Sequence, residues 1–163
     1  MFKSNFNVME MLEMAKEIEK RGYKLYSTQA KRTDNIKLEK IFNKLAADEK
    51  NHYNTFDKLE KEYEKMDKKD YSYLEDVEVN DYLKSLVEYE VFPKGEQEEL
   101  IEMEIEEVLN TAIKSEKDSI LLYQELIPYN NEQTKEVLNK LIEEEKDHYV
   151  KLISFKNEYE DVN

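Results

Sequence analysis

Apolar residues recur at helical spacing along four long stretches of the chain, and short polar segments separate the stretches. Positions three and four apart fall on one side of each stretch, as in helices that bury one face. The predicted helices cover residues 7–33, 35–66, 98–127 and 132–160. We therefore predict an all-α protein.

The connections between the predicted helices differ in length. Short loops at residues 33–35 and 128–131 join the helices into two pairs, and short loops make neighbouring helices antiparallel. Pro128 ends the third helix, because proline lacks the N–H donor and its ring clashes with the preceding turn. The crossover at residues 67–97 is longer and is predicted to hold a short helix around residues 81–89. The pattern predicts a four-helix bundle of two antiparallel hairpins joined by a long crossover.

The two predicted hairpins have similar sequences. The second helix of each hairpin carries the motif Glu-x-x-His at one constant separation, and the first helix of each carries a Glu seven residues before a Tyr. The matching pairs are Glu49 and Glu145, His52 and His148, Glu19 and Glu116, and Tyr26 and Tyr123. Such a repeat predicts two hairpins that pack with approximate two-fold symmetry.

Each apolar stripe is interrupted near its middle by ionisable residues. In the second predicted helix, for example, the interruption lies between Leu45 and Phe56. Residues three apart share a helix face, with about 5–6 Å between their Cβ atoms, so each Glu-x-x-His directs both side chains inward. The interrupting residues are Glu19, Glu49, His52, Glu116, Glu145 and His148.

Four buried glutamates at one level of a bundle require neutralisation. A buried carboxylate costs several kcal/mol unless it is paired or binds a metal, and no Lys or Arg interrupts the stripes at that level. Two divalent cations would cancel four carboxylate charges, and two imidazoles would add neutral nitrogen ligands. Di-iron and di-manganese bundles use this ligand set. We predict a dinuclear metal centre; the alternative is a bundle that keeps these residues but binds zinc or no functional metal.

Two further pairs of residues are candidates for supporting the centre. Tyr26 and Tyr123 lie two turns beyond a glutamate of the stripe and could donate hydrogen bonds to ligand carboxylates, or simply pack in the core. Asp48 and Glu144 each precede a motif glutamate and could orient a histidine on the facing helix, or remain solvated.

Composition narrows the class of protein. A chain of 163 residues fits one domain, residues 1–163, and the 39% of charged residues with only 2 Gly and 2 Pro fits a helical protein. The net charge of −14 argues against nucleic-acid binding. The absence of cysteine excludes disulfides, thiolate metal sites and Fe–S clusters. Early acidic residues and the lack of a long apolar run argue against secretion and membrane insertion, so we expect a cytoplasmic protein.

Several segments resemble the ferritin-like domain of the rubrerythrin family. They are EIEKRGYKLY at 17–26, DEKNH at 48–52, YLKSLVEYEVFP at 82–93, AIKSEKDSILLYQEL at 112–126 and EEEKDH at 143–148. The resemblance implies a ferritin-like bundle with a non-haem di-iron centre that reacts with hydrogen peroxide or dioxygen. By position it makes all six interrupting residues iron ligands, with Glu49 and either Glu145 or Glu116 as bridges. Mn or Zn are possible substitutes for iron.

The chain departs from full-length rubrerythrins in two respects. It lacks the four cysteines of their rubredoxin-like domain, so we expect electrons from an external donor protein such as a rubredoxin. Ser119 stands where rubrerythrins place an additional glutamate, three residues after Glu116. The bacterioferritins share the six-ligand pattern, but Lys50 replaces their haem-binding methionine, so we expect no haem.

The sequence thus predicts a di-iron oxidoreductase that functions as a homodimer. The alternative is a ferritin-like or bacterioferritin-like protein that binds or stores iron and has ferroxidase activity.

Overall fold

The computed structural model describes residues 8–66 and 97–162, and these are almost entirely helical. The helices are α1 (Val8–Arg32), α2 (Ile36–Glu64), α5 (Gln97–Glu102), α6 (Ile105–Leu126) and α7 (Glu132–Val162), with a 3₁₀ turn at Ile127–Tyr129. The predicted all-α class is confirmed. The predicted crossover helix at residues 81–89 lies outside the described residues.

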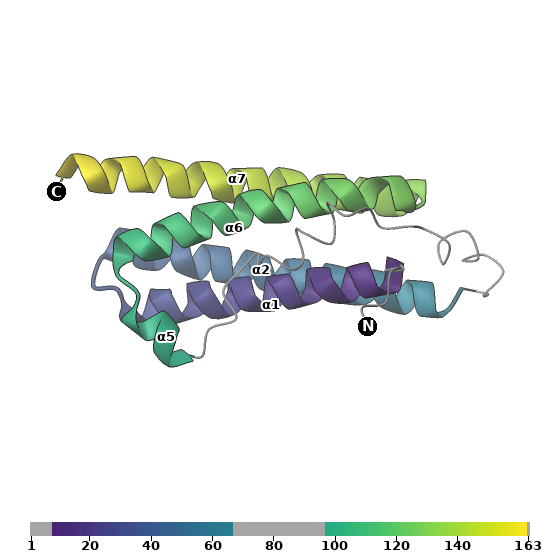
Figure 1. Ribbon diagram of the computed structural model, residues 1–163, viewed down its shortest axis with the longest axis horizontal. Coiled ribbons are helices and arrows are strands. Elements are labelled where there is room, and N and C mark those ends of the chain that lie inside the picture. The colour runs from purple at the N-terminus through teal and green to yellow at the C-terminus, as the bar shows by residue number, and fades with distance from the viewer. Residues whose placement is uncertain (1–7, 67–96, 163) are drawn as a thin grey trace, which may run out of the picture.

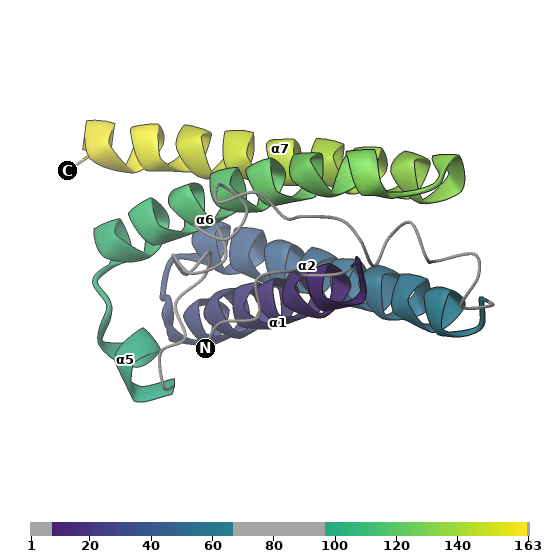
Figure 2. The ribbon, with the colours of Figure 1, turned by 45° about the vertical axis from the view of Figure 1, so that its right-hand side comes forward.

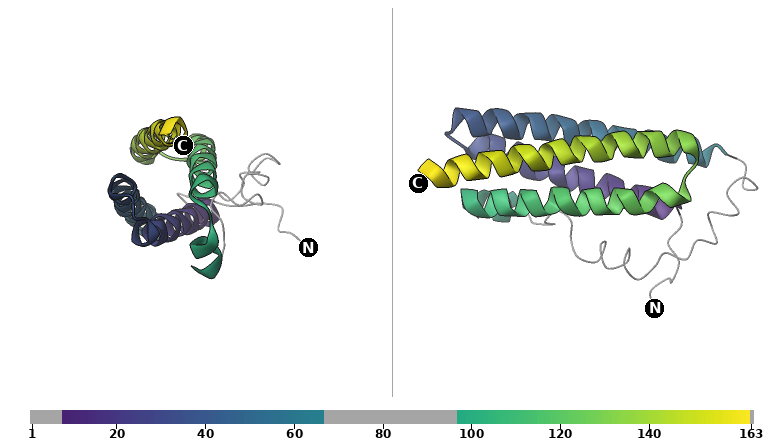
Figure 3. Two further views of the ribbon diagram at one scale, coloured as in Figure 1. Left: turned by 90° about the vertical axis from the view of Figure 1, so that its left-hand side faces the viewer. Right: turned by 90° about the horizontal axis from the view of Figure 1, so that it is seen from above.

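The four long helices of the described part form two antiparallel hairpins, as predicted. Helix α1 packs along α2, and α6 packs along α7, while the short α5 lies beside α1 (Figures 1 and 2). Seen along their axes, the four helices surround a common centre (Figure 3). None of the helices in the described ranges is long and apolar enough to span a membrane.

Asparagine side chains cap the N-terminus of the second helix of each hairpin. Asn35 Oδ1 accepts hydrogen bonds from the backbone N–H groups of Lys37 and Leu38, at 3.0 and 3.1 Å. Asn131 Oδ1 accepts one from the N–H of Thr134 at 2.9 Å. These bonds satisfy N–H groups that have no partner within the helix. Both hairpin turns are therefore encoded locally, which explains why the sequence predicts them well.

The predicted third helix, residues 98–127, is wrong as a single element. The chain breaks it between α5 and α6, where Glu104 has an extended backbone with φ −70° and ψ 152°. Side chains of α1 hold the end of α5: Gln29 Nε2 donates to the carbonyl of Leu100 at 2.5 Å, and Arg32 Nη1 donates to the carbonyl of Met103 at 3.1 Å. In α5, Leu100 is buried, whereas its neighbour Ile101 is exposed.

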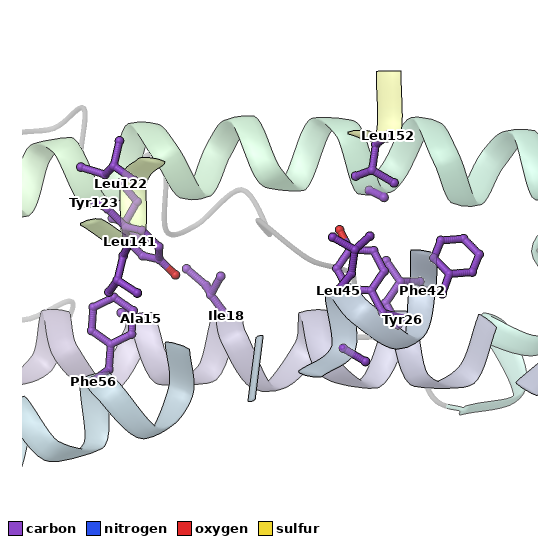
Figure 4. Packing of buried hydrophobic residues seen from close by; sticks show 14 of the residues in the cluster. Ala15, Ile18, Tyr26, Phe42, Leu45, Phe56, Leu122, Tyr123, Leu141 and Leu152 are labelled. Carbon is purple, nitrogen blue, oxygen red and sulfur yellow. The ribbon is translucent and has the colours of Figure 1, made fainter. Parts of the chain in front are cut away.

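The residues of the apolar core that Figure 4 draws gather in two groups along the bundle axis, which are called here the two core clusters. In Figure 4, Ala15, Phe56 and Leu141 lie in one cluster, and Tyr26 and Leu152 lie in the other. The aromatic rings pair within the clusters: the ring centroids of Tyr26 and Phe42 are 6.0 Å apart, and those of Phe56 and Tyr123 are 5.0 Å apart. On each long helix, the residues that interrupt the apolar stripe lie between these two clusters.

Candidate metal centre

The layer between the two core clusters is buried and ionisable. Each long helix contributes to it near its middle, and every member is at most 2% exposed. The structure therefore brings together all six residues singled out from the sequence, which are Glu19, Glu49, His52, Glu116, Glu145 and His148.

The donor atoms of this layer form two overlapping groups. One consists of Glu19, Glu49, His52 and Glu145, the other of Glu49, Glu116, Glu145 and His148, and each offers donor atoms that all lie within 4.8 Å of one another. Glu49 and Glu145 belong to both groups. Of the bridging choices left open by the sequence, this geometry favours the pair Glu49 and Glu145 over Glu116.

Both imidazoles direct Nδ1 toward the carboxylates. His52 Nδ1 lies 2.8 Å from Glu145 Oε1 and 3.5 Å from Glu19 Oε2. His148 Nδ1 lies 3.1 Å from Glu145 Oε2 and 3.3 Å from Glu49 Oε1. The two rings are stacked, with centroids 5.6 Å apart. Each donor group thus contains the Nδ1 of one histidine, His52 in the first group and His148 in the second.

The opposite ring nitrogens face carboxylates on the neighbouring hairpin. His52 Nε2 lies 2.8 Å from Glu144 Oε2, and His148 Nε2 lies 3.1 Å from Asp48 Oδ2. A proton on Nε2 that is donated to a carboxylate leaves the Nδ1 lone pair free for a metal. The contacts that the sequence proposed for Asp48 and Glu144 are therefore present, each reaching the facing helix.

The two tyrosines also act across the hairpins. The hydroxyl of Tyr26 on α1 donates to Glu116 Oε1 on α6, and the hydroxyl of Tyr123 on α6 donates to Glu19 Oε1 on α1. Burial, reinforced by the nearby carboxylates, raises the pKa of both hydroxyls well above the ordinary value. Both therefore remain hydrogen-bond donors at neutral pH and fix one oxygen of each glutamate.

Burial and the neighbouring charges shift the pKa values of the layer in opposite directions. Burial, followed by the charges of neighbouring glutamates, raises the pKa of Glu49 well above its ordinary value and that of Glu116 to about 8. Burial lowers the pKa of His52, but Glu145 and Glu19 outweigh it and raise this pKa to about 12. In the described part of the chain, no lysine or arginine pairs with these glutamates.

Several donor atoms in the layer are left without an aligned hydrogen-bond partner among the described residues. A buried polar atom without a partner costs about 1–3 kcal/mol, so such atoms are rare unless a ligand uses them. The atoms are Glu19 Oε2, Glu49 Oε1, His52 Nδ1, Glu116 Oε2 and Glu145 Oε1. His52 Nδ1 and Glu145 Oε1 are close but lack the alignment that a hydrogen bond requires. The unpartnered atoms of both groups face the centre and fit a pair of oxygen- and nitrogen-ligated cations.

The fold and the site together define the class of the four-helix bundles that hold two metal ions with glutamates and histidines. A family model described as rubrerythrin matches residues 10–106 and 107–162. The chain belongs to the rubrerythrin family.

The comparison with solved structures supports the same fold. A protein from Thermotoga maritima, whose crystal structure is described as that of a ferritin-like diiron-carboxylate protein, is 28% identical to this chain. The match covers 97% of this chain and 99% of that protein, with a TM-score of 0.78. A search of curated protein sequences finds no match. The ferritin-like fold is thus confirmed, and the family and the Glu/His cluster together support a di-iron protein.

Residues around the centre also include some that the sequence did not single out. Lys44, one helical turn before Asp48, places its Nζ 2.5 Å from Asp48 Oδ1. Tyr23 and Tyr53 line a hollow that reaches Glu19. The (i, i+4) spacing of Lys44 and Asp48 signals their pairing, whereas nothing in the local pattern marks the hollow.

Proposed function

We propose that the protein is a non-haem di-iron oxidoreductase that reduces hydrogen peroxide or dioxygen with electrons from an external donor protein. One observation carries the proposal: Glu49 and Glu145 belong to both donor groups, so the six side chains can hold two cations side by side. We assign Glu19, His52, Glu116 and His148 as the remaining ligands. Two iron ions held there would supply two electrons, one each, on oxidation from Fe²⁺ to Fe³⁺.

The protein side chains around the ligands orient them. The protons of the Tyr26 and Tyr123 hydroxyls remain on oxygen and hold the carboxylates of Glu116 and Glu19. The apolar clusters close the layer at both ends, so charge that develops there is poorly screened by solvent. Preorganised donors of this kind cost no reorganisation during reaction.

A second candidate function is iron binding or storage with ferroxidase activity. Ser119 favours it, because this residue is 1% exposed, lies one turn after Glu116 and presents a hydroxyl where a typical rubrerythrin presents a carboxylate. The net charge of −14 also attracts cations to the molecule. Both functions use the same two iron positions. They differ in the oligomer that the chain forms and in whether a donor protein re-reduces the iron.

The decisive experiment is anaerobic loading with Fe²⁺, followed by titration with H₂O₂ and separately with O₂. We expect about two Fe²⁺ per chain to bind and to be oxidised, and reduced rubredoxin to be consumed in repeated turnovers. Iron oxidation without turnover of the donor would reject the oxidoreductase. Light scattering then separates the alternatives, because a dimer fits the enzyme and a large hollow assembly fits storage.

A further inference from the structure

The two histidines of the centre are covered by carboxylates that differ in how firmly they are held. In other respects the centre follows the two-fold repeat of the sequence, since each histidine directs Nδ1 inward and each tyrosine holds a glutamate of the other hairpin. The departure lies at Asp48, which covers His148, and at Glu144, which covers His52.

Asp48 is held at both of its oxygens. Its Oδ2 lies 3.1 Å from His148 Nε2, and its Oδ1 accepts a hydrogen bond from Lys44 Nζ at 2.5 Å. Its side chain is 17% exposed. Lys44 thus pairs with one oxygen of Asp48 while His148 lies beside the other. Moving Asp48 away from His148 would therefore also disturb its ion pair with Lys44.

Glu144 makes one hydrogen-bond contact, with His52, and one longer ion pair, with Lys140. Its Oε2 lies 2.8 Å from His52 Nε2, but its Oε1 is 3.8 Å from Lys140 Nζ, beyond hydrogen-bond distance. The Glu144 side chain is 44% exposed and has one more rotatable bond than an aspartate. Lys140 therefore holds Glu144 less closely than Lys44 holds Asp48.

Two hollows approach the centre from outside. A groove of about 530 Å³ between α2 and α7 is lined by both histidines and by Asp48 and Glu144, the carboxylates that cover them. A separate hollow of about 290 Å³ on the α1–α2 hairpin reaches Glu19, with Tyr23 and Tyr53 on its walls. Glu19 and His52 belong to the same donor group. Both the weakly held cover and this second hollow thus lie at one of the two cation positions.

We propose that the two cation positions are unequal: the position formed with Glu19 and His52 exchanges its cation with solvent, and the position formed with Glu116 and His148 retains it. The inference rests on the proposed di-metal function. It assigns Glu144 as a mobile cover and Asp48, anchored by Lys44, as a fixed one. Both act as positioning residues, since they reach the cations through a histidine.

The test uses the full chain loaded with two equivalents of Zn²⁺ and then mixed with an excess of a chromogenic chelator. We expect two release phases of equal amplitude that differ at least about tenfold in rate, the size of effect that carboxylates behind a histidine ligand have on metal affinity. Crystals of protein that has lost one equivalent, examined by anomalous scattering of zinc, should retain the ion beside His148. Retention beside His52, or release in one phase, would overturn the proposal.

Matched variants connect the two phases to the two covers. Glu144→Gln should accelerate the fast phase alone, and Asp48→Asn should accelerate the slow phase by about tenfold or more. Glu143→Gln, an exposed neighbour of Glu144 that removes the same charge, should change neither phase. Equal effects of Glu144→Gln and Glu143→Gln would overturn the assignment of Glu144. Failure to bind two cations would reject the di-metal function itself, whereas equal release rates in a protein that binds two would reject only this inference.

Discussion

The four buried glutamates differ in how many donor groups they serve. Glu49 and Glu145 have oxygens in both groups, while Glu19 and Glu116 each contribute to one. A shared carboxylate can neutralise and hold two cations at once, so its loss removes a ligand from both positions and leaves their mutual repulsion less screened. The chemistry of the centre therefore depends most on these two residues, one from each hairpin.

This difference gives a prediction for metal stoichiometry. We expect Glu49→Ala to reduce anaerobic Fe²⁺ binding from about two per chain to less than one, and Glu19→Ala to reduce it to about one. The measurement is equilibrium dialysis followed by metal analysis. Glu143→Ala, which removes an exposed carboxylate on α7, serves as the control and should bind as much as the unaltered protein. Equal losses in Glu49→Ala and Glu19→Ala would contradict the sharing of Glu49.

The tyrosine hydroxyls should contribute to stability as well as to the centre. Tyr123→Phe keeps the ring that packs on Phe56 but leaves Glu19 Oε1, which is buried, without its donor. We expect the free energy of unfolding of the chelator-treated protein to fall by about 1–3 kcal/mol, measured by urea denaturation. Tyr23→Phe alters a tyrosine that is 42% exposed and should change it by less than about 0.5 kcal/mol. Similar values for both variants would argue against the Tyr123–Glu19 bond.

Sequence reasoning located the centre because its residues break a periodic rule. Glu49 and His52 stand where α2 should bury apolar side chains, and the second hairpin repeats the feature at Glu145 and His148. What the sequence left open depends on distances between helices. The sharing of Glu49 and Glu145, and the contacts of Asp48 with a histidine on α7, arise only once the two hairpins are placed together.

At the scale of the helices, the local sequence predicted where helices begin and end at the hairpin turns, but it did not predict the break within the third helix. The cap at Asn35 and the helix end near Pro128 depend on a few neighbouring residues, and both hairpin turns lie where the sequence predicts them. The break at Glu104 is different, because the stretch around it contains neither Gly nor Pro. It is stabilised by Gln29 and Arg32, which are about 70 residues away in the sequence. A pattern read along one helix does not contain that information.

The same contacts predict how α5 can be detached. Gln29→Ala combined with Arg32→Ala removes the side chains that bind the carbonyls at the end of α5. We expect amide hydrogen exchange in α5 to accelerate by about tenfold or more, because a helix of 6 residues is not stable alone. Iron binding should remain near two per chain. Lys31→Ala, an exposed residue of the same α1 turn, should leave exchange in α5 unchanged, and acceleration there as well would remove the basis for the assignment.

At the scale of the whole molecule, polar contacts join the two hairpins in addition to the apolar core that they share. Besides the contacts at the centre, Lys37 pairs with Glu158 near one end of the bundle, and Tyr63 donates to Asn130 at the other, at 2.7 Å. The centre itself places four carboxyl groups between the hairpins, and burial raises the pKa of Glu49 and Glu116, so ionising these two is costly when no cation is bound. Cations bound there would join the hairpins, so metal content and stability of the bundle should be coupled.

This coupling gives the last prediction, a rise in melting temperature on metal loading. Because the unfolded chain does not hold the six donors together, Mn²⁺ at about 100 times its Kd should stabilise the fold by about 2.7 kcal/mol per independent site. For a chain of 163 residues, each kcal/mol raises the Tm by about 2–4 °C, so we expect an increase of roughly 5–11 °C for one site and more for two.

Calorimetry with chelator-treated protein, with and without Mn²⁺, measures this rise, and the shift rather than the absolute Tm is compared between variants. Glu49→Ala removes a buried acid and can itself alter the Tm of the chelator-treated protein. Its Tm should nevertheless rise by less than half as much on adding Mn²⁺, since the shared ligand is missing from both positions. A rise of equal size in the variant and the unaltered protein would mean that Mn²⁺ stabilises the bundle at the acidic surface and not at the buried centre.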